Sequence, residues 1–137
     1  MRLIYPDTSA ALKLFKNEAE TAALKAWLST HGSATVLTSD LSRTEAGHAL
    51  HAVGAGAEIT AEAEEWLDES ALVRMPPLLF DRAGQLSPGR RLRSFDALHL
   101  AAAQGPGRAL VAFVAYDERL VESALSLGLP VESPGAA

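Results

Sequence analysis

The seven residues from 109 to 115, Ala-Leu-Val-Ala-Phe-Val-Ala, are all apolar, and this run constrains the fold most. A strand with one face in water alternates apolar and polar side chains. A strand of a parallel sheet that helices cover on both faces is instead apolar throughout. The run is too short for a membrane-spanning helix, which needs about 20 residues. We therefore expect a buried strand of a parallel sheet, with helices on both faces of that sheet.

Shorter apolar runs alternate with amphipathic stretches along the rest of the chain. We expect further strands at 3–5, 36–37, 72–73 and 129–131, and helices at 8–16, 20–29, 41–53, from Thr60 as a cap, around 79–86, from Ser94, and at 118–127. Alternating strands and helices favour a parallel α/β sheet. The predicted fold is a three-layer α/β/α sandwich with a central, mainly parallel sheet of four or five strands. A single domain is predicted over 1–133, with a frayed tail at 134–137.

Composition excludes several kinds of site. The 137 residues include no cysteine, which rules out a disulfide framework, a cysteine-based zinc site and a thiol nucleophile. With neither an apolar span nor the apolar stretch of a signal peptide, we expect a cytoplasmic protein with no membrane partner. The net charge of −5 has the wrong sign for holding nucleic acid by bulk electrostatics. A polyanionic ligand would need a bound cation or a local basic cluster.

Four carboxylates occupy positions where chemistry is expected. Asp7 directly follows the first predicted strand, which ends at Pro6, and Asp117 follows the long apolar strand, one residue beyond Tyr116. Ligands of open α/β sheets bind beyond the carboxyl ends of the strands. Asp96 lies in the first turn of an otherwise apolar helix, and Glu45 lies inside another helix. Each has a simple structural alternative: Asp7 and Asp117 as helix N-caps, Asp96 as a partner of the helix dipole, and Glu45 as part of a Ser42-x-x-Glu45 capping box.

Taken together, the four acids predict a divalent cation site. Carboxylate oxygens are hard ligands suited to Mg²⁺ or Mn²⁺. Two carboxylates about 5 Å apart repel each other by about 3 kcal/mol at an effective dielectric of 20. A bound ion would relieve this repulsion, attract a phosphate and activate water for attack at phosphorus.

The segments around these acids resemble the motifs of a known nuclease family. Tyr5-Pro6-Asp7-Thr8-Ser9-Ala10 resembles the opening motif of PIN-domain nucleases, and Ser42-x-x-Glu45 is similar to their second acidic position. Leu92-Arg93-Ser94-Phe95-Asp96-Ala97-Leu98-His99-Leu100-Ala101 and Tyr116-Asp117-Glu118-Arg119-Leu120 resemble the third and fourth. The resemblance covers nearly the whole chain, in the family's order. Small single-domain members are mostly VapC-type toxins of bacterial toxin–antitoxin pairs, and we place the chain among them.

This resemblance implies an α/β/α sandwich that cleaves RNA with Mg²⁺, for which Mn²⁺ could substitute. It implies that Asp7, Glu45, Asp96 and Asp117 form the catalytic, metal-binding set, with one or two ions. It also implies a homodimer and a small VapB-like antitoxin that blocks the site. One departure stands out: Ala115 occupies a position where the family usually has Thr or Ser, so a hydroxyl that would help orient water or Asp117 is missing.

Polar residues beside the acids are candidates for substrate binding. Ser9 is a polar neighbour of the first acid, and Arg90, Arg91 and Arg93 could hold RNA phosphates through their guanidinium groups. The alternative for the three arginines is a solvated loop. Arg119 is interpreted as helix surface. His99, three residues after Asp96, is either a partner of the acids or a satisfied core histidine.

Two other functions remain open at this stage. The first is a PIN-like module that binds metal and RNA, or only a partner protein, with weak or no cleavage. Ala115, which lacks the hydroxyl usual in the family, supports this alternative. The second is a housekeeping nuclease that processes RNA. The absence of an appended binding module from this short chain argues against the second.

Overall fold

The computed structural model describes residues 1–86 and 92–137, and its core is one sheet of parallel strands. The strands are β1 (Leu3–Pro6), β2 (Thr35–Ser39), β3 (Ala71–Val73), β4 (Leu110–Val114) and β5 (Val131–Glu132). Their order across the sheet is β3-β2-β1-β4-β5, and every neighbouring pair is parallel. The predicted parallel sheet is confirmed. Strand β4, from the apolar run, has a neighbour on each side.

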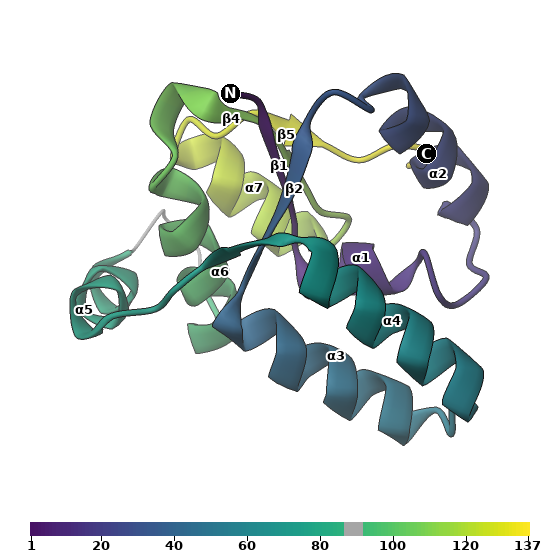
Figure 1. Ribbon diagram of the computed structural model, residues 1–137. Coiled ribbons are helices and arrows are strands. Elements are labelled where there is room, and N and C mark those ends of the chain that lie inside the picture. Colours follow the sequence, from purple (N-terminus) through teal and green to yellow (C-terminus); the bar gives the residue numbers. More distant parts are fainter. Residues whose placement is uncertain (87–91) are drawn as a thin grey trace.

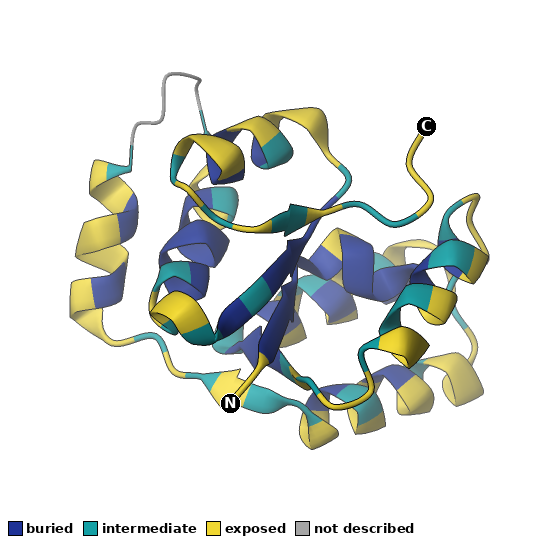
Figure 2. Cartoon of the chain, turned by 90° about the horizontal axis from the view of Figure 1, so that it is seen from above, coloured by how far each residue is buried: buried dark blue, intermediate teal, exposed yellow. Residues whose placement is uncertain are grey.

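Helices cover both faces of this sheet (Figure 1). They are α1 (Thr8–Leu12), α2 (Thr21–Thr30), α3 (Asp40–Ala52), α4 (Ala57–Glu69), α5 (Pro77–Gln85), α6 (Ser94–Gln104) and α7 (Glu118–Ser126). Figure 2 shows buried central strands between helices whose outer surfaces are exposed. The predicted three-layer α/β/α sandwich is therefore confirmed.

Side chains alternate between the two faces along β1, as the period of a strand requires. Leu3 and Tyr5 join a core cluster with α5, α6 and α7, while Ile4 joins a second cluster with α1 and α2. Strand β4 divides in the same way, with Phe113 in the first cluster and Val114 in the second. Because both faces are covered, neither strand presents a face to water, which explains the uninterrupted apolar run.

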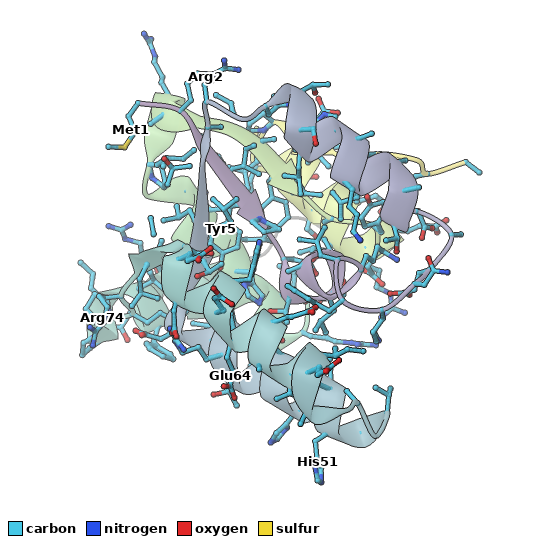
Figure 3. The ribbon with its side chains drawn as sticks, turned by 45° about the vertical axis from the view of Figure 1, so that its right-hand side comes forward. Met1, Arg2, Tyr5, His51, Glu64 and Arg74 are labelled. Atoms are coloured by element: carbon cyan, nitrogen blue, oxygen red, sulfur yellow. The ribbon has the colours of Figure 1, made fainter. Side chains whose placement is uncertain are left out.

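Helices α3 and α4 form a separate hairpin beside α1. Leu12 of α1 packs in a third apolar cluster with residues of the hairpin, including Leu50 and Leu67. Figure 3 shows Tyr5 within the molecule, whereas His51 and Glu64 extend outward from this hairpin. The hairpin thus places α3 next to the end of β1.

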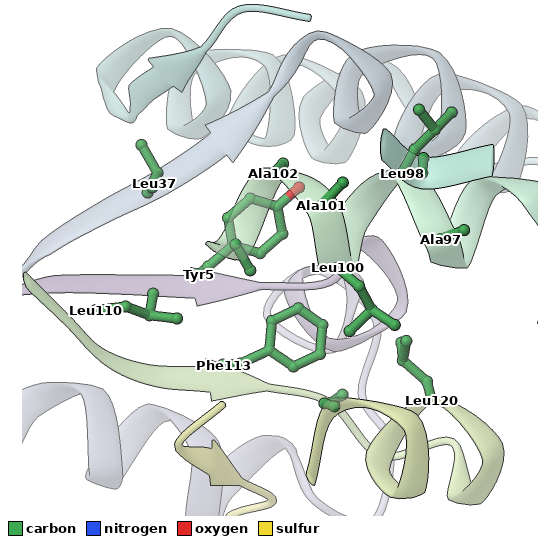
Figure 4. Close-up of a cluster of buried hydrophobic side chains, with 14 of the residues drawn as sticks. Tyr5, Leu37, Ala97, Leu98, Leu100, Ala101, Ala102, Leu110, Phe113 and Leu120 are labelled. Carbon is green, nitrogen blue, oxygen red and sulfur yellow. The ribbon is translucent and has the colours of Figure 1, made fainter. Parts of the chain in front are cut away.

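The tyrosine of β1 lies at the centre of the larger core cluster. Its ring stacks on Phe113, with ring centroids 5.8 Å apart and an angle of 18° between the planes. Figure 4 shows both rings between the sheet and α6, near Leu100. This packing fixes the end of β1 relative to α6.

Several helix boundaries differ from those predicted by the sequence. Helix α1 ends at Leu12 rather than continuing to residue 16; the Thr21 hydroxyl donates to the carbonyls of Lys13 and Lys16 just beyond it. Thr60 does not cap α4, which begins three residues earlier with Gly56 at the N-cap. The capping box of α3 joins Ser39 and Ser42, so the alternative of a box between Ser42 and Glu45 is wrong.

The segment after β5 makes defined contacts with the rest of the chain. Ser133 Oγ donates to the carbonyl of Ala115, and Tyr116 Oη donates to the carbonyl of Pro134 at 2.8 Å. Pro134 falls within the segment that the sequence predicts to be frayed, and its hydrogen bond ties it to the end of β4. The single domain over 1–133 stays a prediction. Across residues 1–86 and 92–137, no helix has the length and apolar character needed to cross a bilayer.

Candidate active site

The four acids predicted from the sequence are neighbours at the carboxyl edge of the sheet. Asp7 follows β1 and Asp117 follows β4, while α3 supplies Glu45 and α6 supplies Asp96. Asp7 interacts electrostatically with Asp96, which in turn interacts with Glu45 and Asp117. In the described part of the chain, no three His, Asp or Glu side chains already form a cluster that could hold a metal ion. The acids therefore share one region without being gathered around one point.

Asp7 is buried, with 6% of its surface exposed, and it caps α1. Its Oδ1 accepts a hydrogen bond of 3.0 Å from the Ala10 N–H, and its Oδ2 accepts one of 2.9 Å from Ser9 Oγ. Burial nevertheless raises the pKa of Asp7, and the charge of Asp96 raises it further. The N-cap alternative is thus correct for Asp7, and the same carboxylate also lies among the other acids.

Glu45 is held by two donors from different elements. Its Oε1 accepts hydrogen bonds from Thr8 Oγ1 at 2.7 Å and from His99 Nε2 at 2.5 Å. Burial acts to raise the pKa of Glu45, but these hydrogen bonds outweigh it and lower the pKa. Glu45 is therefore kept as a carboxylate. Both donors reach Oε1, so neither of them occupies the second carboxylate oxygen.

His99 links Glu45 to the core and is only 1% exposed. The Tyr5 hydroxyl lies 2.7 Å from His99 Nδ1. If Nε2–H donates to Glu45, Nδ1 is left as the acceptor for Tyr5 O–H. Both ring nitrogens of His99 and the Tyr5 hydroxyl then have a hydrogen-bond partner. Both alternatives for His99 therefore hold, because it is a satisfied core residue and also a direct partner of an acid.

Sequence analysis did not assign Tyr5 and Thr8 to the site. Both flank Asp7 within the opening motif, and a hydroxyl on each side of an acid at the end of a buried strand is the signal that could have found them. Burial raises the pKa of Tyr5, so its hydroxyl stays protonated and can donate. We refer to Tyr5, Thr8, Glu45 and His99 as the inner network.

The other two acids lie in an open pocket of about 290 Å³ lined by Leu92, Arg93, Asp96, Asp117 and Arg119. Burial raises the pKa of Asp96, with a further contribution from the charge of Asp117. Asp117 is exposed and caps α7, since its Oδ1 accepts a hydrogen bond of 3.0 Å from the Leu120 N–H. The N-cap alternative is therefore correct for Asp117 as well. We refer to this hollow as the acidic pocket.

Of the three arginines predicted to bind substrate, the structure describes one. Arg93 lines the acidic pocket, while Arg90 and Arg91 lie outside the described residues. Arg119, interpreted from the sequence as helix surface, is exposed but also lines the acidic pocket. Ala115 is fully buried and offers the site no hydroxyl.

A parallel sheet between helices, with four acids at its carboxyl edge, is the arrangement implied by the motifs. The family model described as PIN domain matches residues 4–124. The chain belongs to the PIN domain family.

Within this family, the chain is similar to curated ribonucleases from Mycobacterium tuberculosis. It is 37% identical over 136 residues to Ribonuclease VapC47, covering 98% of each chain. It is 36% identical over 142 residues to Ribonuclease VapC35, covering 98% of this chain and 99% of that protein.

Two solved structures share the fold. One is VapBC2 from Rickettsia felis bound to a DNA fragment from its promoter, with a TM-score of 0.75, 11% identity, and coverage of 96% of this chain and 98% of that chain. The other is the sarcin-ricin loop cleaving toxin VapC20 of Mycobacterium tuberculosis, with a TM-score of 0.71 and 20% identity, covering 86% of this chain and 92% of that chain.

Proposed function

We propose that this chain is a metal-dependent endoribonuclease that hydrolyses RNA phosphodiester bonds as the toxin of a toxin–antitoxin pair. The observation that carries the proposal is the position of the four acids at one edge of the sheet. Asp96 lies close enough to the other three for their charges to interact. The similarity over the full chain to proteins named Ribonuclease VapC supports RNA as the substrate. The VapBC2 complex among the structures of the same fold supports a small VapB-like antitoxin as partner.

The donor set fits a hard divalent cation. Asp7, Glu45, Asp96 and Asp117 would hold Mg²⁺, with Mn²⁺ as a possible substitute. Burial is the main cause of the raised pKa values of Asp7 and Asp96, and neighbouring carboxylates raise them further. A bound cation would stabilise the charged form of both carboxylates. When bound, such an ion supplies an activated water and stabilises negative charge at phosphorus.

The residues of the chain divide the remaining tasks. Thr8 and His99 orient the Glu45 carboxylate, and Ser9 and the Ala10 N–H orient Asp7. Two of the acids are thus held in fixed positions before substrate arrives, which lowers the cost of reaching a reactive arrangement. Arg93, at the acidic pocket, would contact the RNA backbone near Asp96 and Asp117.

One observation supports a second candidate function. Ala115 directly follows β4, two residues before Asp117, and places a buried methyl group where the family usually has a hydroxyl. If efficient cleavage requires that hydroxyl, the chain is a PIN-like module that binds metal and RNA and cleaves only weakly. The similarity to proteins named Ribonuclease VapC favours a toxin over a housekeeping nuclease. The homodimer and the cytoplasmic location stay predictions.

Cleavage of a structured RNA by the purified chain tests the proposal. Cleavage is expected with Mg²⁺ or Mn²⁺, and it should stop with EDTA or in Asp96→Asn. Glu64→Gln is the matched control, because it removes one acidic charge from the outward side of α4. Cleavage that survives both EDTA and Asp96→Asn would overturn the proposal, while metal-dependent RNA binding without cleavage would favour the second candidate.

The role as a toxin has its own test. Induced expression of the wild-type chain in bacteria is expected to arrest growth. Asp96→Asn is expected to relieve the arrest at an equal protein level. Arrest of the same strength by both chains would contradict a toxic effect that depends on cleavage.

A further inference from the structure

Two arginines from different parts of the chain meet at the open side of the site. Arg93 directly precedes α6, and Arg119 lies in the first turn of α7. Both line the acidic pocket with Asp96 and Asp117. A second hollow of about 390 Å³ is lined by Leu92, Arg93, Ser94 and Arg119, and we refer to it as the arginine pocket. Because three residues line both hollows, the two pockets adjoin, and the arginines stand between them.

The two pockets differ in charge. The acidic pocket contains two carboxylates beside the two arginines, so its opposite charges balance. The arginine pocket has the same two arginines, and none of the described residues that line it carries a carboxylate. It is therefore locally positive on a chain whose net charge is −5. A guanidinium group presents paired N–H donors in the geometry that phosphate oxygens accept.

We propose that the arginine pocket is a phosphate subsite, which binds the phosphate of the RNA nucleotide next to the bond that is cleaved. This inference rests on the proposed nuclease function, because that function places the reacting phosphate at the acidic pocket. The RNA strand must continue from there over an adjoining surface. Contacts to phosphate position a strand without reading its bases, so the subsite contributes affinity that does not depend on sequence.

A simpler role for the arginines predicts different behaviour. The positive charge of Arg93 counteracts the rise in the pKa of Asp96, so the arginines could serve only to balance the acids. In that case, removing one positive charge would tighten divalent cation binding and leave RNA affinity without metal unchanged. A phosphate subsite instead predicts weaker RNA binding, and less dependence of that binding on salt, when either arginine is removed.

Three glutamine variants separate these roles. Arg93→Gln and Arg119→Gln each remove one arginine of the subsite. Arg108→Gln is the matched control, since Arg108 is exposed on the 3₁₀ turn Gly107–Ala109 that precedes β4, at the opposite edge of the sheet. The affinity of each chain for a fluorescently labelled single-stranded RNA is measured by anisotropy over a series of salt concentrations. EDTA is present, so that no metal-dependent cleavage takes place.

Both subsite variants are expected to bind the RNA about tenfold more weakly than the wild type, because each loses one charge-assisted contact. The slope of log affinity against log salt should fall by about 0.7 for each arginine removed from a single-strand site. Arg108→Gln should match the wild type, and Arg119→Lys should keep most of the salt dependence because it keeps the charge. Thermal melting of each variant confirms that it is folded.

Two results would overturn the subsite. One is an equal loss of affinity in all three glutamine variants, which would indicate bulk charge alone. The other is unchanged RNA binding together with tighter Mn²⁺ binding in Arg93→Gln, which would indicate charge balance. If the wild type cleaves no RNA with metal but the two subsite variants still lose binding, the nuclease proposal fails and the arginine pocket is a phosphate site for RNA that is bound without cleavage.

Discussion

The inner network and the acidic pocket are neighbouring parts of the same site, but they shift the pKa of a carboxyl group in opposite directions. In the inner network, Glu45 is held by His99 and Thr8, and its pKa is lowered. In the acidic pocket, Asp96 has a raised pKa and Asp117 is exposed. Two side-chain donors hold the inner acid, whereas the outer acids line an open pocket that a ligand can enter, although Asp117 also caps α7 through Oδ1. The comparison indicates that one side of the site is rigid scaffold and the other is the binding surface.

Removal of His99 should have the largest effect on stability. His99→Ala opens a cavity and leaves Tyr5 O–H and the Glu45 carboxylate without their shared partner, so we expect a loss of about 3 kcal/mol in the free energy of unfolding. Urea denaturation measures this loss. Asp96→Asn, one turn earlier on α6, is the control. It should leave stability unchanged or raise it, because burial disfavours the charge of Asp96. If the two variants lose the same free energy of unfolding, the inner network does not stabilise the fold more than the acidic pocket does.

Tyr5→Phe should have a smaller effect. The substitution keeps the stacking on Phe113 but removes the hydrogen bond to His99, which leaves a buried ring nitrogen unpaired. We expect a loss of about 1–2 kcal/mol in the same denaturation measurement. Tyr116→Phe removes a hydroxyl that donates to Pro134 at a half-buried position, and it should cost less. If Tyr116→Phe proves the more costly change, the buried chain of hydrogen bonds is not a main source of stability.

Asp117 tests how much the outer acids contribute to the fold. Asp117→Ala should lose about 1 kcal/mol, because the Leu120 N–H at the start of α7 loses its cap. Asp117→Asn should restore most of that stability, because Asn is an equally good N-cap, while cleavage stays impaired. Thermal melting and RNA cleavage, measured on the same samples, report the two properties separately. Recovery of cleavage in Asp117→Asn would show that the carboxylate charge is not needed.

Asp7→Asn should have the smallest effect and the opposite sign. The folded-state pKa of Asp7 is raised above its ordinary value of 3.8, so the folded chain binds the proton more tightly than the unfolded chain. In metal-free buffer, its contribution to stability therefore declines as pH rises above about 3.8 and through the raised pKa. Asn keeps the cap without the charge, so the variant should gain up to about 1 kcal/mol at neutral pH.

The pH dependence of unfolding checks this prediction and contrasts Asp7 with Glu45. The lowered pKa of Glu45 gives a contribution that is present above its ordinary value of 4.5 and is lost as pH falls through the folded-state pKa. Asp7→Asn should remove the decrease in the free energy of unfolding as pH rises toward neutral. Glu45→Gln should remove the decrease in the free energy of unfolding as pH falls into the acid range. A lower melting temperature of Asp7→Asn at neutral pH would show that its carboxylate acts mainly as a cap.

Most of the fold follows from local pattern in the sequence. The apolar run at 109–115 predicts a buried parallel strand, and β4 is one; residues 3–5 predict the strand that becomes β1. Strand ends then place Asp7 and Asp117 at the same edge of the sheet. The sequence predicts the ends of helices less accurately: α1 ends earlier, and α4 begins earlier, than the apolar periodicity predicts. The Thr21 hydroxyl, which donates to carbonyls just beyond α1, and the glycine N-cap of α4 are both outside the apolar periodicity of those helices.

The sequence by itself determined a parallel α/β sheet and the edge at which its acids would be found, because strand periodicity and the alternation of elements are local properties. Only the tertiary structure decided which side chains touch. Tyr5 and His99 are 94 positions apart, and Thr8 and Glu45 are 37 apart. Arg119 acquires its place beside Arg93 only when α6 and α7 pack on the sheet. Hydrogen bonds and pockets depend on distances of a few ångströms between such residues, and no pattern within a single segment contains those distances.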